Sequence, residues 1–298
     1  MQIKRHRGRA IATAFAVFAL AALGFAGVAQ AKLTGAYTVF QNCPYNNAET
    51  NRCLYSLTEG GEFVLGSKKV PIVNPVTLQA GYTVPVAEFS KLIAATNGVT
   101  LSKTPQPVPG GLAGLVNCKE ISNFLLRISC EVTFENGLTG VNSTLELAKP
   151  PNEVLFSELH FAEGEEVALR MPAKVHLENP FLGSNCYVGS SSSPIILELT
   201  TGETVPPGPN KSITGSAGAI SFLEGGRIIK STENSLVDNA WSAPGASGCG
   251  GIFSFILDPI VNASSGLPAA AGKNTAILNG TSYLATAVAV RKNNEANP

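Results

Sequence analysis

Short runs of alternating apolar and polar residues, broken by Gly, Pro and Asn, make up most of the chain beyond its N-terminal segment. Such alternation is typical of strands that bury one face in an antiparallel sheet. It predicts strands at residues 125–134, 143–148, 194–200, 219–224 and 282–290. We therefore expect a mainly β protein.

One segment, residues 85–96, has a helical period instead. Its apolar side chains would share one face of a helix: Val86, Phe89, Leu92 and Ile93. The Asn97-Gly98 pair that follows would end this helix. We expect one short helix here.

Glycine-containing pairs separate several of the strand-like runs: Gly60-Gly61, Gly225-Gly226 and Asn279-Gly280. A two-residue hairpin turn needs positive φ angles, which glycine adopts without steric cost. We predict a hairpin turn at each pair.

The chain contains one stretch and a partial copy of it, EGGEFVLGSKKVPIVNP at 59–75 and EGEEVALRMPAKVHLENP at 163–180. Leu-Thr-Gly also occurs twice, at 33–35 and 138–140, with nearly the same spacing. This predicts two tandem antiparallel β-sandwich-like units that arose by duplication. The first domain would cover residues 32–137 and the second, larger domain residues 138–298. Similar hairpins within a single sandwich are the alternative interpretation.

The N-terminal segment has the features of a cleaved signal peptide, residues 1–31. Basic residues precede a long apolar run, which ends in Ala29-Gln30-Ala31. A membrane anchor is the alternative, but the run is barely long enough to span a bilayer and is rich in Ala and Gly. We expect a secreted, extracellular or envelope-associated protein without a membrane span after cleavage.

Charge argues against a nucleic-acid partner. Lys and Arg total 21, as do Asp and Glu, and removal of residues 1–31 takes away basic residues only. The remaining chain is therefore net acidic.

Six cysteines follow the predicted cleavage site. An even number in an exported chain indicates disulfides, because exported proteins meet an oxidising environment. Fifteen pairings are possible; the simplest joins sequence neighbours, namely Cys43–Cys53, Cys118–Cys130 and Cys186–Cys249. No C-x-x-C occurs, so we expect no metal site at these residues.

Recognised catalytic motifs are missing, since the chain has no G-x-S-x-G, S-x-x-K or H-E-x-x-H. A triad would have to combine His160 or His176 with Asp238 or Asp258, the only two Asp residues. A glutamate cluster (Glu163, Glu165 and Glu166) could hold a cation weakly, but we favour a solvated turn as its explanation. We predict no catalytic residue, no metal and no cofactor.

The best candidates for a binding site lie late in the chain. Residues 234–251 mix polar, small and aromatic residues, including Asp238, Asn239 and the only tryptophan, Trp241. Two further candidates, His176 and Glu178, precede an Asn-Pro turn. A structural loop that is tied down by a disulfide and covered by Trp241 is the competing interpretation.

Three stretches resemble a family of exported, disulfide-containing, β-rich proteins of high-GC Gram-positive bacteria. They are KVHLENPFLGSNCYVGSSSSPIILELTTG, NSLVDNAWSAPGASGCGGIFSFILDP and AGKNTAILNGTSYL. The resemblance implies a bacterial, exported protein. It implies no activity, cofactor or residue role.

We expect a non-catalytic exported β protein that acts in or outside the cell envelope through a binding or structural surface. The predicted partner is a cell-wall or extracellular glycan or another envelope protein. One alternative is a secreted hydrolase of glycans or esters with its site in the second domain, for which His176, Glu178, Asp238 and Trp241 would have to converge. Another is a self-assembling surface component.

Overall fold

Antiparallel strands dominate the structure, a computed structural model that describes residues 32–111, 122–125, 127–128 and 140–297. In the first half of the chain they are β1 (Arg52–Leu65), β2 (Lys68–Pro71), β3 (Val76–Tyr82), β4 (Ser90–Ile93), β5 (Gln106–Pro107), β6 (Asn142–Leu147) and β7 (Leu155–Phe156). The second half contains β8 (Leu169–Glu178), β9 (Tyr187–Val188), β10 (Ile195–Leu199), β11 (Ala219–Leu223), β12 (Ile228–Asp238), β13 (Ala246–Ser247) and β14 (Thr275–Thr286).

Helices are short in the described part of the chain. The α-helices are α3 (Glu158–Glu163), α4 (Ser254–Ser265) and α5 (Ala287–Glu295). The 3₁₀ helices are η1 (Gly35–Phe40), η3 (Pro151–Glu153), η4 (Glu224–Gly226) and η5 (Gly251–Phe253).

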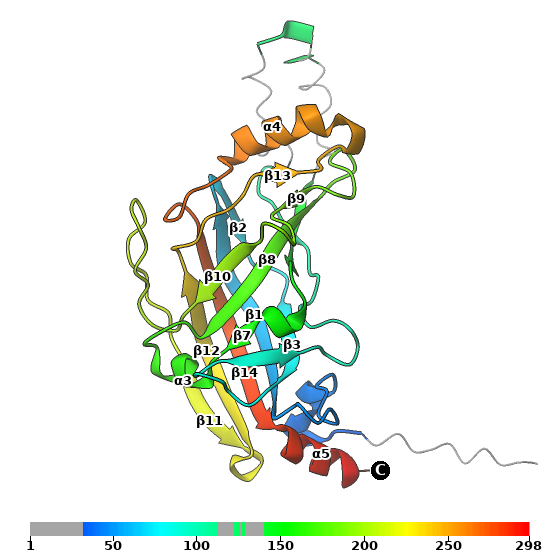
Figure 1. The fold of residues 1–298 in the computed structure, drawn as a ribbon, viewed down its shortest axis with the longest axis vertical. Coiled ribbons are helices and arrows are strands. Elements are labelled where there is room, and N and C mark those ends of the chain that lie inside the picture. The colour runs from blue at the N-terminus through cyan, green and yellow to red at the C-terminus, as the bar shows by residue number, and fades with distance from the viewer. Residues whose placement is uncertain (1–31, 112–121, 126, 129–139, 298) are drawn as a thin grey trace, which may run out of the picture. The chain divides into compact units, whose positions relative to one another are not determined.

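All the described strands belong to one large sheet of 14 strands. Its main path is β11-β12-β14-β1-β3-β4-β7-β8-β6-β5, while β2 pairs with β1, β9 and β10 pair with β8, and β13 pairs with β9 (Figure 1). The prediction of a mainly β protein is confirmed. Predicted strands at 143–148, 194–200 and 219–224 correspond to β6, β10 and β11.

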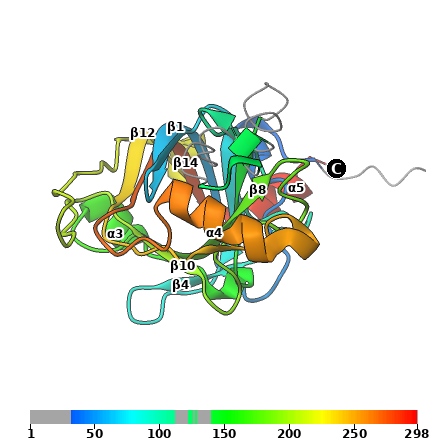
Figure 2. The ribbon, with the colours of Figure 1, turned by 90° about the horizontal axis from the view of Figure 1, so that it is seen from above.

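The sheet folds over on itself, and the core lies between its two halves. Buried side chains alternate along β8, from Leu169 through Met171 and Val175, and face buried residues of the other half such as Leu78 and Leu236 in a single apolar cluster. A cavity of about 100 Å³ remains between them. Helix α4 lies across one end of the long strands (Figures 1 and 2).

The Gly60-Gly61 and Asn279-Gly280 pairs do not form turns, so these two predictions are wrong. Strand β1 runs straight through the first pair and β14 through the second, and the two strands pair along their length with a register shift between Thr58 and Gly60. At Gly61, φ is +106° and an added Cβ would lie 1.9 Å from the carbonyl oxygen of Ile277. Glycine is thus required for close strand contact.

Other local predictions had mixed outcomes. Gly225-Gly226 does form the turn between β11 and β12, with φ of +66° and +87°. The helix predicted at 85–96 is wrong: Val86 and Phe89 bridge across a turn, and β4 follows. The turn needs positive φ at Ala87 and Glu88, which ends any helical path, and the apolar residues after it fit a strand equally well.

Several predictions fall partly or wholly on residues that the structure does not describe. They concern the signal peptide, Cys118, Cys130 and most of the strand at 125–134, of which residues 125, 127 and 128 are helical. The strand predicted at 282–290 changes into α5 at Ala287.

The repeated stretch adopts two different structures. Its first copy forms the β1–β2 hairpin, whereas the second forms the end of α3 and the single strand β8. The division into two tandem domains stays a prediction.

Two disulfides occur among the described residues, and both join the predicted neighbours. Cys43–Cys53 ties the segment after η1 to β1, and Cys186–Cys249 ties the segment before β9 to that after β13. Disulfides persist in oxidising compartments, so they indicate that the chain reaches one. None of the described helices is long and apolar enough to cross a membrane.

The Gly61→Ala substitution should lower the free energy of unfolding by about 1–3 kcal/mol, because the new methyl group clashes with the β14 backbone. Gly60→Ala is the matched control: an added Cβ there meets no atom within 4 Å, and we expect a change within about 1 kcal/mol. Urea unfolding of both variants measures the difference. Equal stability of the two variants would contradict the requirement for glycine at position 61.

Candidate functional site

Three of the predicted binding residues, Asp238, Asn239 and Trp241, lie at the end of β12 and just after it, and all three are buried. Trp241 is only 4% exposed; its indole packs on Phe63 with ring centroids 5.1 Å apart and donates a hydrogen bond to the Asp238 carbonyl oxygen at 3.3 Å. The Asn239 amide donates to the carbonyl oxygen of Lys211 at 2.8 Å. These side chains therefore hold the loop in place.

The carboxylate of Asp238 is satisfied by the backbone. It accepts hydrogen bonds from the amides of Glu198 at 2.7 Å and Ala240 at 2.9 Å. Burial raises the pKa of Asp238 above its ordinary value, although these hydrogen bonds act in the opposite direction. With Trp241, Asp238 lines a cavity of about 420 Å³.

The other two predicted residues, His176 and Glu178, lie on β8 in a separate charged cluster. The His176 ring stacks on Tyr187 at 4.4 Å, and its Nδ1 is 3.4 Å from a carboxylate oxygen of Glu178. Neighbouring Glu146 forms ion pairs with Lys174 at 3.3 Å and with Lys103 at 3.4 Å. The Glu146 carboxylate of this cluster is thus already paired with two lysines.

The predicted residues form two groups, because neither His176 nor Glu178 lines the cavity at Asp238 and Trp241. A hydrolytic site built from all four residues would need them to converge. This arrangement gives no support to that alternative.

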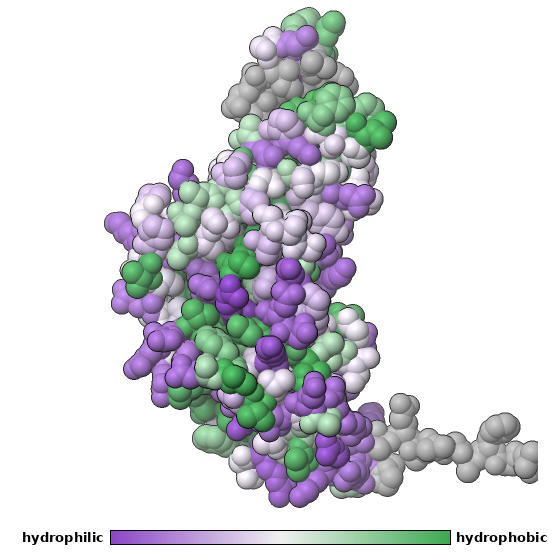
Figure 3. Space-filling model, viewed as in Figure 1, coloured by the Kyte–Doolittle hydropathy of each residue, from purple (hydrophilic) through white to green (hydrophobic). Residues whose placement is uncertain are grey.

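An apolar groove of about 550 Å³, which sequence reasoning did not find, lies between α3 and the face of β11, β12 and β14. Its sheet side is formed by residues on neighbouring strands, and its helix side by α3 and the turn before β4. The lining includes Ile220, Phe222, Ile229, Leu284, Leu159 and Phe161. In Figure 3, hydrophobic surface gathers over α3 and β11.

Large apolar side chains are exposed along this groove. Ile220 and Phe222 of β11 are 45% and 67% exposed, and Leu159 of α3 is 50% exposed. Exposed apolar residues that are contiguous mark interaction sites more often than scattered ones do.

Helix α3 is fixed by its own capping residues and by the strands around it. The Ser157 hydroxyl accepts a hydrogen bond from the His160 amide, and Gly164 ends the helix with φ of +71°. The Thr201 hydroxyl donates to the Phe161 carbonyl oxygen at 2.8 Å. A six-residue helix is unstable alone, so these contacts determine where its side chains lie.

Glu158, the first residue of α3, also lines the groove. The Tyr82 hydroxyl donates a hydrogen bond to its carboxylate, and the Arg52 guanidinium lies 3.4 Å away. Burial raises the pKa of Glu158 above its ordinary value, and the charge of Arg52 opposes this.

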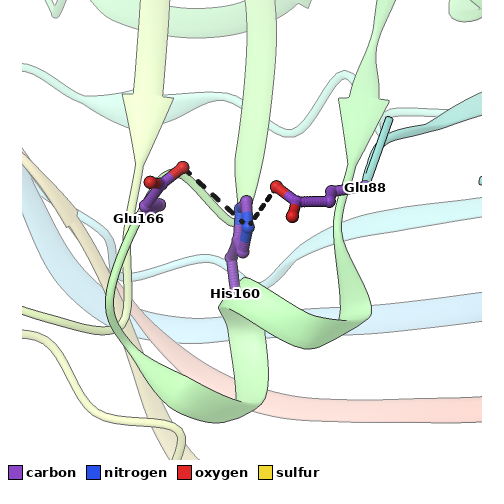
Figure 4. Close-up of side chains that lie close together, drawn as sticks. All are labelled: Glu88, His160 and Glu166. Atoms are coloured by element: carbon purple, nitrogen blue, oxygen red, sulfur yellow. Dashed lines mark ion pairs between the residues drawn. The ribbon is translucent and has the colours of Figure 1, made fainter. Parts of the chain in front are cut away.

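His160, also on α3, does not line the groove and is only 4% exposed. Its Nε2 is 3.2 Å from a carboxylate oxygen of Glu88 and 3.9 Å from one of Glu166 (Figure 4). Of the predicted glutamate cluster (Glu163, Glu165 and Glu166), only Glu166 lies close to His160. Glu88 comes from the segment that the sequence predicted to be helical, which is why this cluster was missed.

No protein-family model, no curated protein and no solved structure matches this chain. The bacterial family resemblance therefore stays a prediction.

The raised pKa of Glu158 makes stability depend on pH. Between the ordinary value of 4.5 and the raised value, the folded state holds a proton that the unfolded state has released. The stabilisation is therefore complete below 4.5 and is lost as the pH rises through the raised pKa. The raised pKa of Asp238 likewise makes the free energy of unfolding decrease as the pH rises.

Glu158→Gln should reduce this slope, because the amide does not titrate in this pH range. The amide oxygen can still accept the hydrogen bond from Tyr82, so the local structure is kept. Urea unfolding at pH values from about 4 to about 7 measures the slope. An unchanged slope in the variant would show that Glu158 does not carry a raised pKa.

Proposed function

We propose that this chain is a non-catalytic, exported binding protein whose apolar groove receives an extended segment of another envelope polypeptide. The segment adds a strand to the free edge of β11 and places alternate side chains in the groove. The observation that carries the proposal is the exposed, apolar edge strand beside the groove.

The free edge of β11 supports this proposal. Among the described strands it pairs only with β12, so one row of its backbone N–H and C=O groups has no strand partner. Four of its five residues are exposed, and its sequence, AISFL, contains no Lys or Pro. Proteins commonly protect edge strands with such residues, and an unprotected edge pairs readily with another chain.

The side chains of β11 are arranged for recognition of alternating residues. Ile220 and Phe222 point to the same face of the sheet. They pair with Ser231 and Ile229 of β12, which line the groove as well. In strand addition, backbone hydrogen bonds supply affinity and pockets for every second side chain supply specificity. An added strand would continue this face along the groove, with apolar side chains against Ile220, Phe222 and Leu159.

A polypeptide partner fits this surface better than a glycan does. The only tryptophan, Trp241, is buried, and although Phe222 in the groove is exposed, most of the residues around it are apolar and cannot form hydrogen bonds to sugar hydroxyls. The groove is lined mainly by aliphatic residues and phenylalanines. Of the predicted partners, another envelope protein is therefore favoured over a glycan.

Export remains part of the proposal. The predicted signal peptide and the two disulfides support a protein that acts outside the cytoplasm.

Selection from a library of short random peptides tests the groove directly. We expect the oxidised protein to enrich peptides with apolar residues at alternate positions. A selected peptide, labelled and titrated by fluorescence anisotropy, should bind Phe222→Asp at least about tenfold more weakly, because the substitution places a charge in the apolar groove.

Phe255→Asp is the matched control, since Phe255 is 75% exposed but lies on α4, away from the groove. We expect it to bind as the unaltered protein does. Failure to select any binder, or equal loss in both variants, would contradict the proposal. Concentration-dependent self-association that Phe222→Asp abolishes, measured by analytical ultracentrifugation, would instead favour the self-assembling surface component.

A further inference from the structure

We propose that Glu88, His160 and Glu166 form a binding site for a divalent transition-metal ion, and that zinc is the ion their donor atoms fit best. The site lies beside the groove, and its existence does not require that the groove binds a peptide. The lack of a local metal-ligand motif predicted no metal, and these ligands come from segments that are far apart in the chain.

A backbone contact determines which ring nitrogen of His160 carries the hydrogen. Its Nδ1 lies 2.9 Å from the carbonyl oxygen of Val167. A carbonyl oxygen only accepts hydrogen bonds, so Nδ1 carries the hydrogen and a neutral ring presents a lone pair at Nε2. Metal-binding histidines commonly have their second ring nitrogen fixed in this way.

The Nε2 atom of His160 faces negative charge. The carboxylate oxygens of Glu88 and Glu166 lie 3.2 Å and 3.9 Å from it, so a ring with no hydrogen on Nε2 would be repelled by them unless a cation lay between. A cation between them removes the repulsion. A proton on Nε2 could form one direct hydrogen bond, to Glu88, whereas a metal ion can bind all three groups.

The distances suit a tetrahedral ion. Zinc binds histidine nitrogen and carboxylate oxygen at about 2.0–2.2 Å, which separates neighbouring ligand atoms by roughly 3.3–3.5 Å. The His160–Glu88 distance of 3.2 Å is close to this value. All three ligand atoms lie within 4.8 Å of one another, and the exposed Glu166 side chain can close the remaining gap by rotation.

The site has one rigid ligand and two accessible ones. His160 is buried against Phe89, with ring centroids 5.5 Å apart, whereas the side chains of Glu88 and Glu166 are largely exposed. The Glu166 backbone is held by the Thr200 hydroxyl, which donates to its carbonyl oxygen at 2.7 Å. An ion can therefore enter from solvent and meet a prepared histidine.

Within the described part of the chain, neither Glu88 nor Glu166 forms an ion pair with Lys or Arg. The cluster at His176 differs, because Lys174 lies 3.3 Å from its glutamate, Glu146. That cluster resembles the proposed site in residue type, but its charge is already balanced, so we expect no ion there.

The donor set indicates which metals bind. An imidazole nitrogen with two carboxylates suits zinc and related transition metals, whereas calcium and magnesium prefer oxygen ligands alone. Three protein ligands leave the fourth position of a tetrahedral ion to water.

Titration calorimetry of the purified, oxidised protein with zinc chloride tests the proposal. We expect one zinc ion per chain and no comparable binding of calcium. His160→Gln, Glu88→Gln and Glu166→Gln should each weaken zinc binding at least about tenfold, as loss of a ligand or its support does in other sites. Zinc should also raise the Tm of the unaltered protein and not that of these variants.

His176→Gln is the matched control and should bind zinc as the unaltered protein does. Because Glu88 and Glu166 are exposed, their variants keep the test valid if His160→Gln fails to fold. The proposal is overturned if zinc does not bind, or if it binds Glu88→Gln and Glu166→Gln with unchanged affinity. It is equally overturned if His176→Gln alone abolishes binding.

Discussion

The pairing of β1 with β14 is the constraint on which the rest of the structure depends. Their ladder runs from Arg52 to Val64 on one strand and from Thr286 to Thr275 on the other. β1 then carries β3 along one part and β2 along the other, while β14 carries β12 and through it β11. The groove and the free edge therefore exist only if this central pair forms in the correct register. A one-residue slip would move every side chain to the opposite face.

The strands that could be predicted from the sequence are those in which apolar and polar residues alternate. Alternation in β6, β10 and β11 follows from one buried face, which a short segment reveals by itself. Glycine is less informative, because the same residue permits a turn and a close approach between strands. Gly225-Gly226 does the first, whereas Gly61 does the second by leaving room for the Ile277 carbonyl. Only the pairing partner distinguishes them, and the partner is far away in the sequence.

The candidate site illustrates the same limit. Asp238 and Trp241 drew attention because they combine charge with an aromatic ring, yet both are used to hold their own loop in place. The groove instead combines ordinary apolar residues of β11, β12 and α3, none of which is unusual in sequence. Likewise, Glu88 and His160 meet only because a turn with positive φ replaces the expected helix. Chemistry that arises from contacts between distant segments is not visible in local patterns.

The groove and the proposed metal site share Glu88, and this sharing has a physical consequence. The wall formed by α3 is already fixed, because Ser157, Thr201 and Tyr82 all bond to it. The turn that carries Glu88 is less constrained: its backbone is closed by the mutual hydrogen bonds of Val86 and Phe89. An ion bound to Glu88 and to the rigid His160 would therefore restrain this turn and define one rim of the groove. Metal binding would then reduce the conformational freedom that a peptide partner must otherwise remove on binding, so the two sites would be thermodynamically coupled.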